Sequence, residues 1–420
     1  MTSKDPVMGC FVFIHLPGET TPVVCGRFEQ RAEGSTTEGR FTYGRTYRAR
    51  PDAVPIDPEG MALQEGTLPA TIRLGGIYPA LRDAAPDAWG RRVIEYARGV
   101  REALSEVEYL LGAGVDRAGA LSFGTEAEAL PLPTGHHGTT RLPDLLDAAE
   151  RLETDAPATP DMIRAAQLLL HEFTMGGARP KAVIEDAGAL WIAKFPGRGD
   201  RFSHAAAEAA CLTVAAACGM DVPEHRTVQV GNRLVLLVRR FERRGAPAAP
   251  ERARYLSALT LLGGDETFSK EWSYLKLADA LRKRSNRPTD DRRELFRRMV
   301  LNALVSNGDD HPRNHAIIAW TADDWHLAPL FDVVPTHREW TRARDLALIA
   351  GDQGRRATRA NLLSAANVFG MTPEEATAVI DRTRDLLRET WETAFLAHGG
   401  TADEAVSLRH AINPAGFEDP

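Results

Sequence analysis

Residues 306–315 read Ser-Asn-Gly-Asp-Asp-His-Pro-Arg-Asn-His, and a short apolar hairpin then leads to Leu-Phe-Asp at 330–332. Asp309 and Asn314 stand five residues apart. At that spacing an aspartate can orient an attacking hydroxyl while the asparagine holds a metal ion. The predicted hairpin carries Asp332 back, where its carboxylate can hold the metal on a triphosphate. The pattern Asp-x-x-x-x-Asn alone is a weak functional signal, because both residue types are common in loops. Its coupling to the hairpin makes it the strongest functional signal in the chain.

Two other interpretations start from the same segment. Asp310 could act as the base, but only the first aspartate of the pair has the five-residue offset to the asparagine. His311 and His315 are four residues apart and could bind zinc, but zinc pairs at that spacing lie on a regular helix with a glutamate between them. Because Pro312 interrupts the segment, we expect both histidines to support a loop, with His311 holding it by hydrogen bonding.

The composition is that of a soluble globular protein, since 43% of the residues are hydrophobic and 26% are charged. At 420 residues the chain is too long for one ordinary core, which suggests two or three lobes. A net charge of −7 gives no bulk basicity that would indicate nucleic acid or an anionic membrane. The four cysteines lack Cys-x-x-Cys spacing, and no window approaches 18 uninterrupted apolar residues. We therefore expect a cytoplasmic protein without membrane contact, disulfide scaffold or zinc site.

The pattern divides the chain into four segments. Residues 1–130 combine β-rich runs with helical patterns, which predicts a small N-terminal α/β subdomain. Prolines and glycines make 131–160 a predicted linker. Residues 161–240 follow the order strand, strand, helix, strand, strand, which is typical of the nucleotide-binding lobe of a kinase, and 241–420 are mostly helical. The predicted fold class is an α/β (α+β) bilobal protein-kinase-like fold.

A lysine and a glutamate in the nucleotide lobe fit the same template. Lys194 lies among apolar neighbours in Trp-Ile-Ala-Lys-Phe at 191–195. A lysine on such a strand neutralises α- and β-phosphates when a carboxylate on the next helix aims it, and Glu208 is the candidate. An isolated edge-strand lysine would reach solvent, but here separate parts agree with one template. The segment Gly176-Gly177-Ala178-Arg179-Pro180-Lys181 can bring backbone N–H groups close to phosphate, although a plain helix-to-strand turn explains its glycines equally well.

These residues resemble the HipA family, the serine/threonine kinase toxins of bacterial type II toxin–antitoxin pairs. The resemblance spans most of the chain and includes 77–91 and 110–123 in the N-terminal lobe. Its specific part is five ordered blocks of the kinase core: Gly177-Ala178-Arg179-Pro180-Lys181, Ile192 to Pro196, Arg240 to Arg243, Asn307 to His315, and Leu327 to Asp332.

The resemblance implies that ATP and Mg²⁺ are the cofactors and that Asp309 is the catalytic base. It implies Asn314 and Asp332 as metal ligands, with Glu208 in a supporting role. The residues that it implies for cofactor binding are Gly176, Gly177, Ala178, Arg179, Pro180, Lys181, Lys194, Arg239, Arg240, Phe241, His311, Asn314, Phe331 and Asp332.

The resemblance also implies regulation and partners. In this family a serine just before the glycine loop can be autophosphorylated, which ejects the loop and silences the kinase. Thr174 stands at that place here, where its hydroxyl could equally cap a helix end. The implied partner is a small helix-turn-helix antitoxin of the HipB type, through which alone DNA would be reached. The implied protein substrate is an aminoacyl-tRNA synthetase, with the glutamyl type as first expectation, so that translation and growth would be inhibited.

Two other functions start from the same residues. A degenerate kinase could bind nucleotide without turnover and act as a co-repressor through the antitoxin, but the intact acidic pair argues against this. A small-molecule phosphotransferase also uses Asp and Asn around a hairpin, but the N-terminal α/β lobe favours the toxin family.

Overall fold

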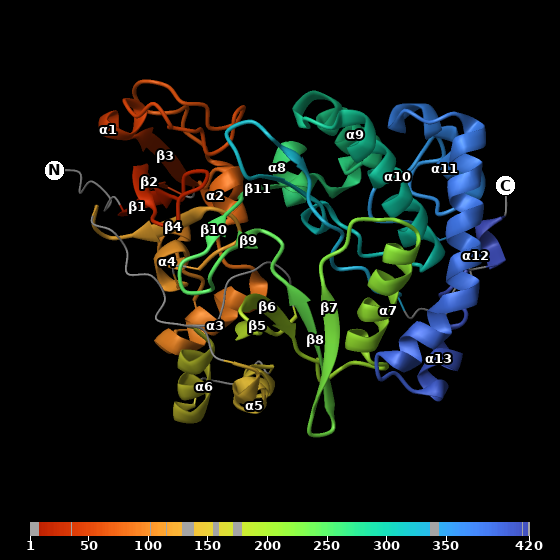
Figure 1. Ribbon diagram of the computed structural model, residues 1–420. Coiled ribbons are helices and arrows are strands. Elements are labelled where there is room, and N and C mark those ends of the chain that lie inside the picture. Colours follow the sequence, from red (N-terminus) through yellow and green to blue (C-terminus); the bar gives the residue numbers. More distant parts are fainter. Residues whose placement is uncertain are drawn as a thin grey trace. The chain divides into compact units, whose positions relative to one another are not determined.

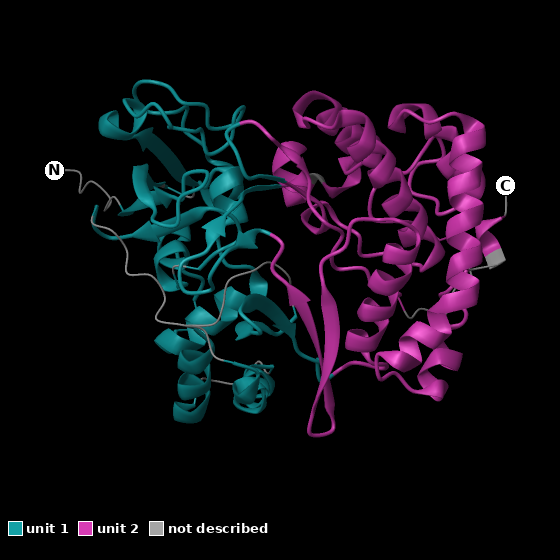
Figure 2. Ribbon diagram, viewed as in Figure 1, with its two compact units in different colours: residues 1–198, 242–256, 318–322 teal, residues 199–241, 257–317, 323–420 magenta. Residues whose placement is uncertain are grey.

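The computed structural model describes most of the chain, namely residues 8–34, 36–100, 102–114, 116–127, 138–153, 159–170, 179–336, 344–413 and 415–418. Its contacts divide into two compact units, which Figure 2 shows in two colours. Unit 1 comprises 1–198, 242–256 and 318–322, whereas unit 2 comprises 199–241, 257–317 and 323–420. Each unit therefore gathers segments that are distant in the sequence.

Unit 1 contains an antiparallel four-stranded sheet in the order β3-β2-β1-β4 (Figure 1). Its strands are β1 (Met8–Ile14), β2 (Val23–Glu33), β3 (Thr36–Tyr43) and β4 (Leu121–Gly124). The end of β1 is buried on both faces, since Val12, Phe13 and Ile14 are at most 1% exposed. The β-rich runs predicted these strands correctly, but β2 continues to Glu33 because its second half pairs with β3. Cross-strand pairing thus lengthens a strand whose own residues, such as Glu29 and Gln30, do not favour one.

Capping side chains decide where the helices of unit 1 begin. Asp87 accepts a hydrogen bond from the Gly90 N–H at the start of α3. Ser105 and Glu108 form a capping box, so α4 begins at Glu106. The helices of unit 1 are α1 (Arg45–Arg48), α2 (Pro79–Asp83), α3 (Ala88–Arg98), α4 (Glu106–Gly112), α5 (Leu142–Leu152) and α6 (Pro160–Leu170).

Two tight hairpins follow, one in each unit. In unit 1, β5 (Lys181–Asp186) pairs with β6 (Ala189–Lys194) around Ala187 and Gly188, which have φ angles of 49° and 72°. In unit 2, β7 (His225–Val230) pairs with β8 (Arg233–Arg239) around a turn that contains Gly231 at φ 58°. Left-handed backbone in two-residue turns matches the twist of antiparallel strands. The predicted order strand, strand, helix, strand, strand within 161–240 is confirmed.

Buried ion pairs attach the excursion 242–256 to unit 1. Its hairpin consists of β9 (Arg243–Arg244) and β10 (Glu251–Arg252). The Arg243 guanidinium donates to Asp116 Oδ1 at 2.8 Å, and both side chains are at most 5% exposed. Because a buried charge is costly unless it is paired, these contacts hold the excursion to unit 1.

Unit 2 is mostly helical, as predicted. Its helices are α7 (His204–Ala217), α8 (Ala258–Leu261), α9 (Tyr274–Arg284), α10 (Pro288–Leu304), α11 (Arg359–Ser364), α12 (Pro373–Ala397) and α13 (Ala402–Leu408). The long helix α12 packs against α7 and α10 (Figure 1). Three short strands complete the order of elements: β11 (Arg254–Ser257) and β12 (Ala316–Ala319), whose residues are divided between the two units, and β13 (His326–Leu327) in unit 2. None of the helices within the described ranges is long and apolar enough to span a bilayer.

The stretch 131–160 that the sequence predicted as a linker contains α5. This helix is amphipathic, with Leu145 and Leu152 fully buried. It packs against α3 and α6. The predicted domain boundaries at 130, 160 and 240 stay predictions.

Thr372→Ala should lower the free energy of unfolding by about 1 kcal/mol. Thr372 accepts a hydrogen bond from the Glu375 N–H at 3.2 Å, and the Glu375 carboxylate accepts one from the Thr372 N–H at 2.9 Å. The substitution removes one side of this capping box. Urea denaturation measures the loss, with Thr377→Ala inside the same helix as the control. Equal changes in the free energy of unfolding of the two variants would contradict the capping role of Thr372.

Candidate functional site

A strained turn precedes the candidate catalytic loop. Ser306 has a φ of 54°, which costs a non-glycine residue roughly 1 kcal/mol or more. Its hydroxyl donates to the Ala411 carbonyl at 2.7 Å and accepts from the Arg344 guanidinium at 3.0 Å. The Thr336 N–H donates to the Ser306 carbonyl at 3.1 Å. Thr336, Arg344 and Ala411 therefore stabilise the turn just before Asp309.

The two adjacent aspartates of the loop have opposite environments. Asp309 is exposed, whereas Asp310 is 1% exposed. The Asp310 carboxylate accepts a hydrogen bond from His315 Nε2 at 2.8 Å and another from the Tyr274 hydroxyl. A buried carboxylate held by two donors is inaccessible to a substrate. The geometry therefore favours Asp309 over Asp310 as the group that meets a hydroxyl.

Asp309 and Asn314, which are five residues apart in the sequence, are in direct contact in the folded loop. A 3-10 turn at Pro312–Asn314 brings the asparagine back, and its Nδ2 donates to the Asp309 carbonyl at 3.2 Å. Asn314 is 4% exposed. Because Nδ2 is engaged in this way, the amide has a fixed orientation, with Oδ1 as the atom that can accept or coordinate.

Asp332 and Glu208 come together in unit 2. Asp332 follows β13 and has a left-handed φ of 64°. Its N–H donates to Glu208 Oε1 at 3.2 Å, and Glu208 is 4% exposed on α7. Aspartate tolerates the left-handed region better than most residues. The helix carboxylate thus fixes the main chain of the residue that was predicted to bind metal.

An aromatic pair links two more of the predicted residues. Phe241 and Phe331 stack with ring centroids 5.6 Å apart and planes inclined by 30°. Arg240 is 1% exposed. Arg239 instead forms an ion pair with Glu224 at 3.1 Å, with both side chains about half exposed. The roles predicted for Arg239, Arg240, Phe241 and Phe331 in nucleotide binding stay predictions.

The predicted residues of unit 1 lie at one end of the β5–β6 hairpin. Lys181 and Lys194 are directly opposite each other across the two strands. The buried Lys181 ammonium forms an ion pair with Asp87 at 3.1 Å, at the start of α3. Pro180 accepts a hydrogen bond from the Phe195 N–H. Arg179 is described, but Thr174, Gly176, Gly177 and Ala178 lie outside the described residues, so the predicted phosphate loop is described only from Arg179 onward.

The donor atoms near the loop suit magnesium. Asn314 offers an amide oxygen and Asp332 a carboxylate, and hard oxygen ligands are those that Mg²⁺ prefers. Within the described ranges no three His, Cys, Asp or Glu side chains come together. Magnesium in kinases usually binds through one or two protein groups together with phosphates, so the residues present fit the ion.

Of the two histidines that were expected to support the loop, His315 does so through its side chain. His311 Nδ1 is buried and has no hydrogen-bond partner among the described residues. His315 bonds to Asp310 instead. Sequence reasoning also missed Tyr274 and Asn302, and it gave no separate role to Asn307 within the block 307–315. No local motif marks Tyr274, because it stands 36 residues from Asp310.

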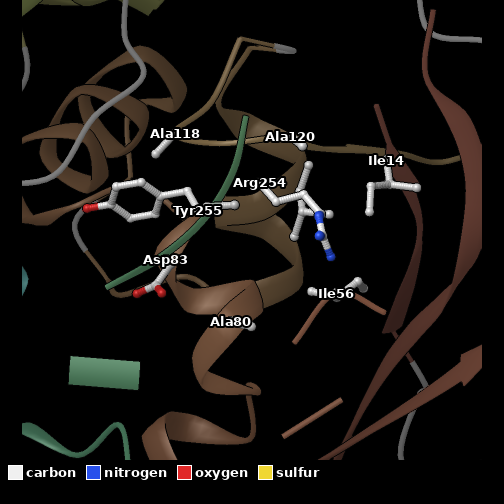
Figure 3. Close-up of a pocket in the computed structure, with 10 residues that line it drawn as sticks. Ile14, Ile56, Ala80, Asp83, Ala118, Ala120, Arg254 and Tyr255 are labelled. Atoms are coloured by element: carbon white, nitrogen blue, oxygen red, sulfur yellow. The ribbon is translucent and has the colours of Figure 1, made fainter. Parts of the chain in front are cut away.

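A small cavity in unit 1 is lined by none of the predicted site residues. Arg254, Tyr255 and Asp83 line it together with alanines and isoleucines (Figure 3). Its volume of about 10 Å³ is close to the room that one water molecule needs. This cavity is therefore not a substrate site.

Comparisons with known proteins identify the family to which the chain belongs. The family model for the HipA-like C-terminal domain matches residues 173–391. Two proteins of Sinorhizobium fredii are similar in sequence. "Putative kinase Y4dM" is 25% identical over 50% of this chain and 53% of its own length, so the chain spans about half of that relative. "Putative kinase Y4mE" is 28% identical over 74% of this chain and 75% of its own length.

A solved structure shares the fold over nearly the whole chain. The HipA toxin of Shewanella oneidensis MR-1, solved with HipB and operator DNA, superposes with a TM-score of 0.68 at 17% identity. The match covers 96% of this chain and 94% of that one. The predicted fold class is thereby confirmed. Since the family model covers more than half of the residues, the chain belongs to the family of proteins with a HipA-like C-terminal domain.

Proposed function

We propose that the protein is an ATP-dependent serine/threonine protein kinase that acts as the toxin of a toxin–antitoxin pair. The observation that carries the proposal is the loop at 309–314, where Asp309 is exposed and its main chain is bound by the Asn314 amide. Asp332, fixed by Glu208, supplies the second carboxylate that phosphoryl transfer needs.

The chemistry follows from what each side chain can do. Asp309 orients the acceptor hydroxyl and takes its proton as the bond to the γ-phosphorus forms. The bond between that phosphorus and the β–γ bridging oxygen of ATP breaks, and ADP leaves. Asn314 and Asp332 would hold Mg²⁺, which neutralises charge on the triphosphate. Lys194 would neutralise the α- and β-phosphates. Catalysis then consists mainly of positioning and charge neutralisation, with no covalent work by the protein.

The proposed partners are an aminoacyl-tRNA synthetase as substrate, with the glutamyl type first, and a small HipB-like antitoxin. The fold shared with a HipA that was solved together with HipB and DNA supports the antitoxin. A net charge of −7 gives no bulk basicity for binding DNA, so any DNA contact would run chiefly through the antitoxin. The proposal that an aminoacyl-tRNA synthetase is the substrate rests on family resemblance alone.

The test is transfer of labelled γ-phosphate from Mg-ATP to a panel of purified aminoacyl-tRNA synthetases. We expect phosphoserine or phosphothreonine on one of them. A parallel titration with a nucleotide analogue measures binding. Binding without transfer to any protein would support the co-repressor function instead, and transfer only to small molecules would support the phosphotransferase.

Glu208→Ala should lower kcat/KM about 10- to 100-fold, because it removes the buried oxygen that accepts the Asp332 N–H. Glu208→Gln keeps an acceptor oxygen and should restore part of the activity. Steady-state kinetics on both variants, with the exposed Glu389→Ala of unit 2 as the control, measure the effect. Equal losses in the Ala and Gln variants would show that the charge of Glu208 matters and not its contact with Asp332.

A further inference from the structure

Asp310, the buried neighbour of the predicted base, ends a chain of hydrogen bonds. Its carboxylate accepts from the Tyr274 hydroxyl and from His315 Nε2. Among the described residues His315 Nδ1 has no hydrogen-bond partner. Because a carboxylate oxygen can only accept, His315 Nε2 carries the proton of its bond to Asp310. Asp310 is then a buried carboxylate held by two donors.

The series of hydrogen bonds continues from Tyr274 back to the loop at 309–314. Asn302 Nδ2 donates to the Tyr274 hydroxyl oxygen at 3.3 Å, and Asn302 Oδ1 accepts from Asn307 Nδ2 at 3.0 Å. Asn307 Oδ1 in turn accepts from the Asp309 main-chain N–H at 3.3 Å. The chain therefore starts on the backbone of Asp309 and ends on the side chain of Asp310.

All donors in this chain point the same way. From the Asp309 N–H each group accepts one bond and donates the next, until the Tyr274 O–H donates to the carboxylate. Aligned hydrogen bonds polarise and strengthen one another. Burial, the charge of Asp310 and the bond to it raise the pKa of Tyr274 well above its usual value, so the hydroxyl keeps the proton that it donates.

Burial makes this series of hydrogen bonds rigid. Tyr274 and Asn302 are fully buried, and Asn307 and Asp310 are at most 2% exposed. Tyr274 opens α9 and Asn302 lies on α10, so two packed helices carry the middle of the chain. With Asp310 held inward by these contacts, Asp309 remains on the exposed side of the loop.

We propose that Tyr274 is a positioning residue for phosphoryl transfer, which acts through Asn302, Asn307 and Asp310 to fix the direction of Asp309. This inference rests on the proposed function for its effect on rate, but the hydrogen-bonded chain can be tested without it. Tyr274 touches neither the substrate nor the metal ligands in this role. Within the described residues, the Tyr274 hydroxyl joins the hydrogen bonds of Asn302 and Asn307 to the Asp310 carboxylate.

The test compares Tyr274→Phe with Tyr47→Phe. Tyr47 is a matched control in unit 1, because its buried hydroxyl also makes two hydrogen bonds, both with Val54. Tyr274→Phe should lower kcat about 10- to 100-fold, since small misplacements of a catalytic group have effects of this size. The affinity for the nucleotide analogue should change less than about twofold, because a factor of two is well under 1 kcal/mol. Tyr47→Phe should lose similar stability and keep its kcat.

A second readout separates this inference from the proposed function. Hydrogen exchange at the Asp309 amide, measured by NMR, should be slow in the wild type and clearly faster in Tyr274→Phe and in Asn302→Ala. An inactive wild type would refute the proposed function, while the exchange data would still test the chain. Unchanged exchange at Asp309 in both variants, or an unchanged kcat in folded Tyr274→Phe, would overturn the positioning role.

Discussion

Asp309→Ala should leave the protein folded and lower phosphoryl transfer from Mg-ATP by about 10²- to 10⁴-fold, the range that general base catalysis contributes. The side chain of Asp309 is exposed, and the contacts that hold the loop run through its backbone. Its removal should therefore change the free energy of unfolding by less than about 0.5 kcal/mol. Nucleotide binding should also be retained. The substitution removes the group that positions the acceptor hydroxyl, but it removes no contact with the triphosphate.

The control is Asp323→Ala, which removes another exposed aspartate from unit 2. Both variants are assayed for kcat on the same protein substrate, and for stability by urea denaturation. An Asp309→Ala protein that transfers phosphate at the wild-type rate would refute the assignment of the base. A large loss of stability in this variant would instead show that the side chain has a structural role.

Asp332→Asn should lower kcat about 10²- to 10³-fold, as loss of one charge-stabilising group does in other enzymes. Asparagine is the informative replacement, because it tolerates the φ of 64° that Asp332 adopts and keeps the N–H that binds Glu208. Alanine would add backbone strain of the order of 1 kcal/mol and confuse the result. Asp332→Asn thus changes the charge with little effect on the main chain.

The same variant should respond differently to metal. If the carboxylate holds Mg²⁺, a higher Mg²⁺ concentration should restore part of the activity of Asp332→Asn and little of that of Asp309→Ala. The measurement is a titration of activity against free Mg²⁺ at saturating ATP. Identical Mg²⁺ dependence in wild type and Asp332→Asn would exclude Asp332 as a metal ligand.

Features set by neighbouring residues were predictable from the sequence. The turn at Ala187-Gly188 follows from residues that adopt positive φ, and the capping box at Thr372 follows from a three-residue spacing. The loop at 309–314 and the strands β12 and β13 after it likewise stand where the sequence placed them. In each case the chain holds the decisive groups within a few residues of one another.

Features set by distant contacts were not predictable. The sequence does not show that Asp310 is buried, because its partner Tyr274 lies on another helix. Nor does it show that Lys181 pairs with Asp87, 94 residues earlier. Such pairs form only when tertiary packing brings two segments together. The strained φ angles of Ser306 and Asp332 also depend on contacts from residues far along the chain.

The most direct measurement is a crystal structure of the protein with Mg²⁺ and a non-hydrolysable ATP analogue. We predict that Asn314 Oδ1 and the Asp332 carboxylate bind the metal, and that the Asp309 carboxylate faces the terminal phosphate. A nucleotide whose metal contacts neither residue, or whose terminal phosphate lies far from Asp309, would contradict the kinase site.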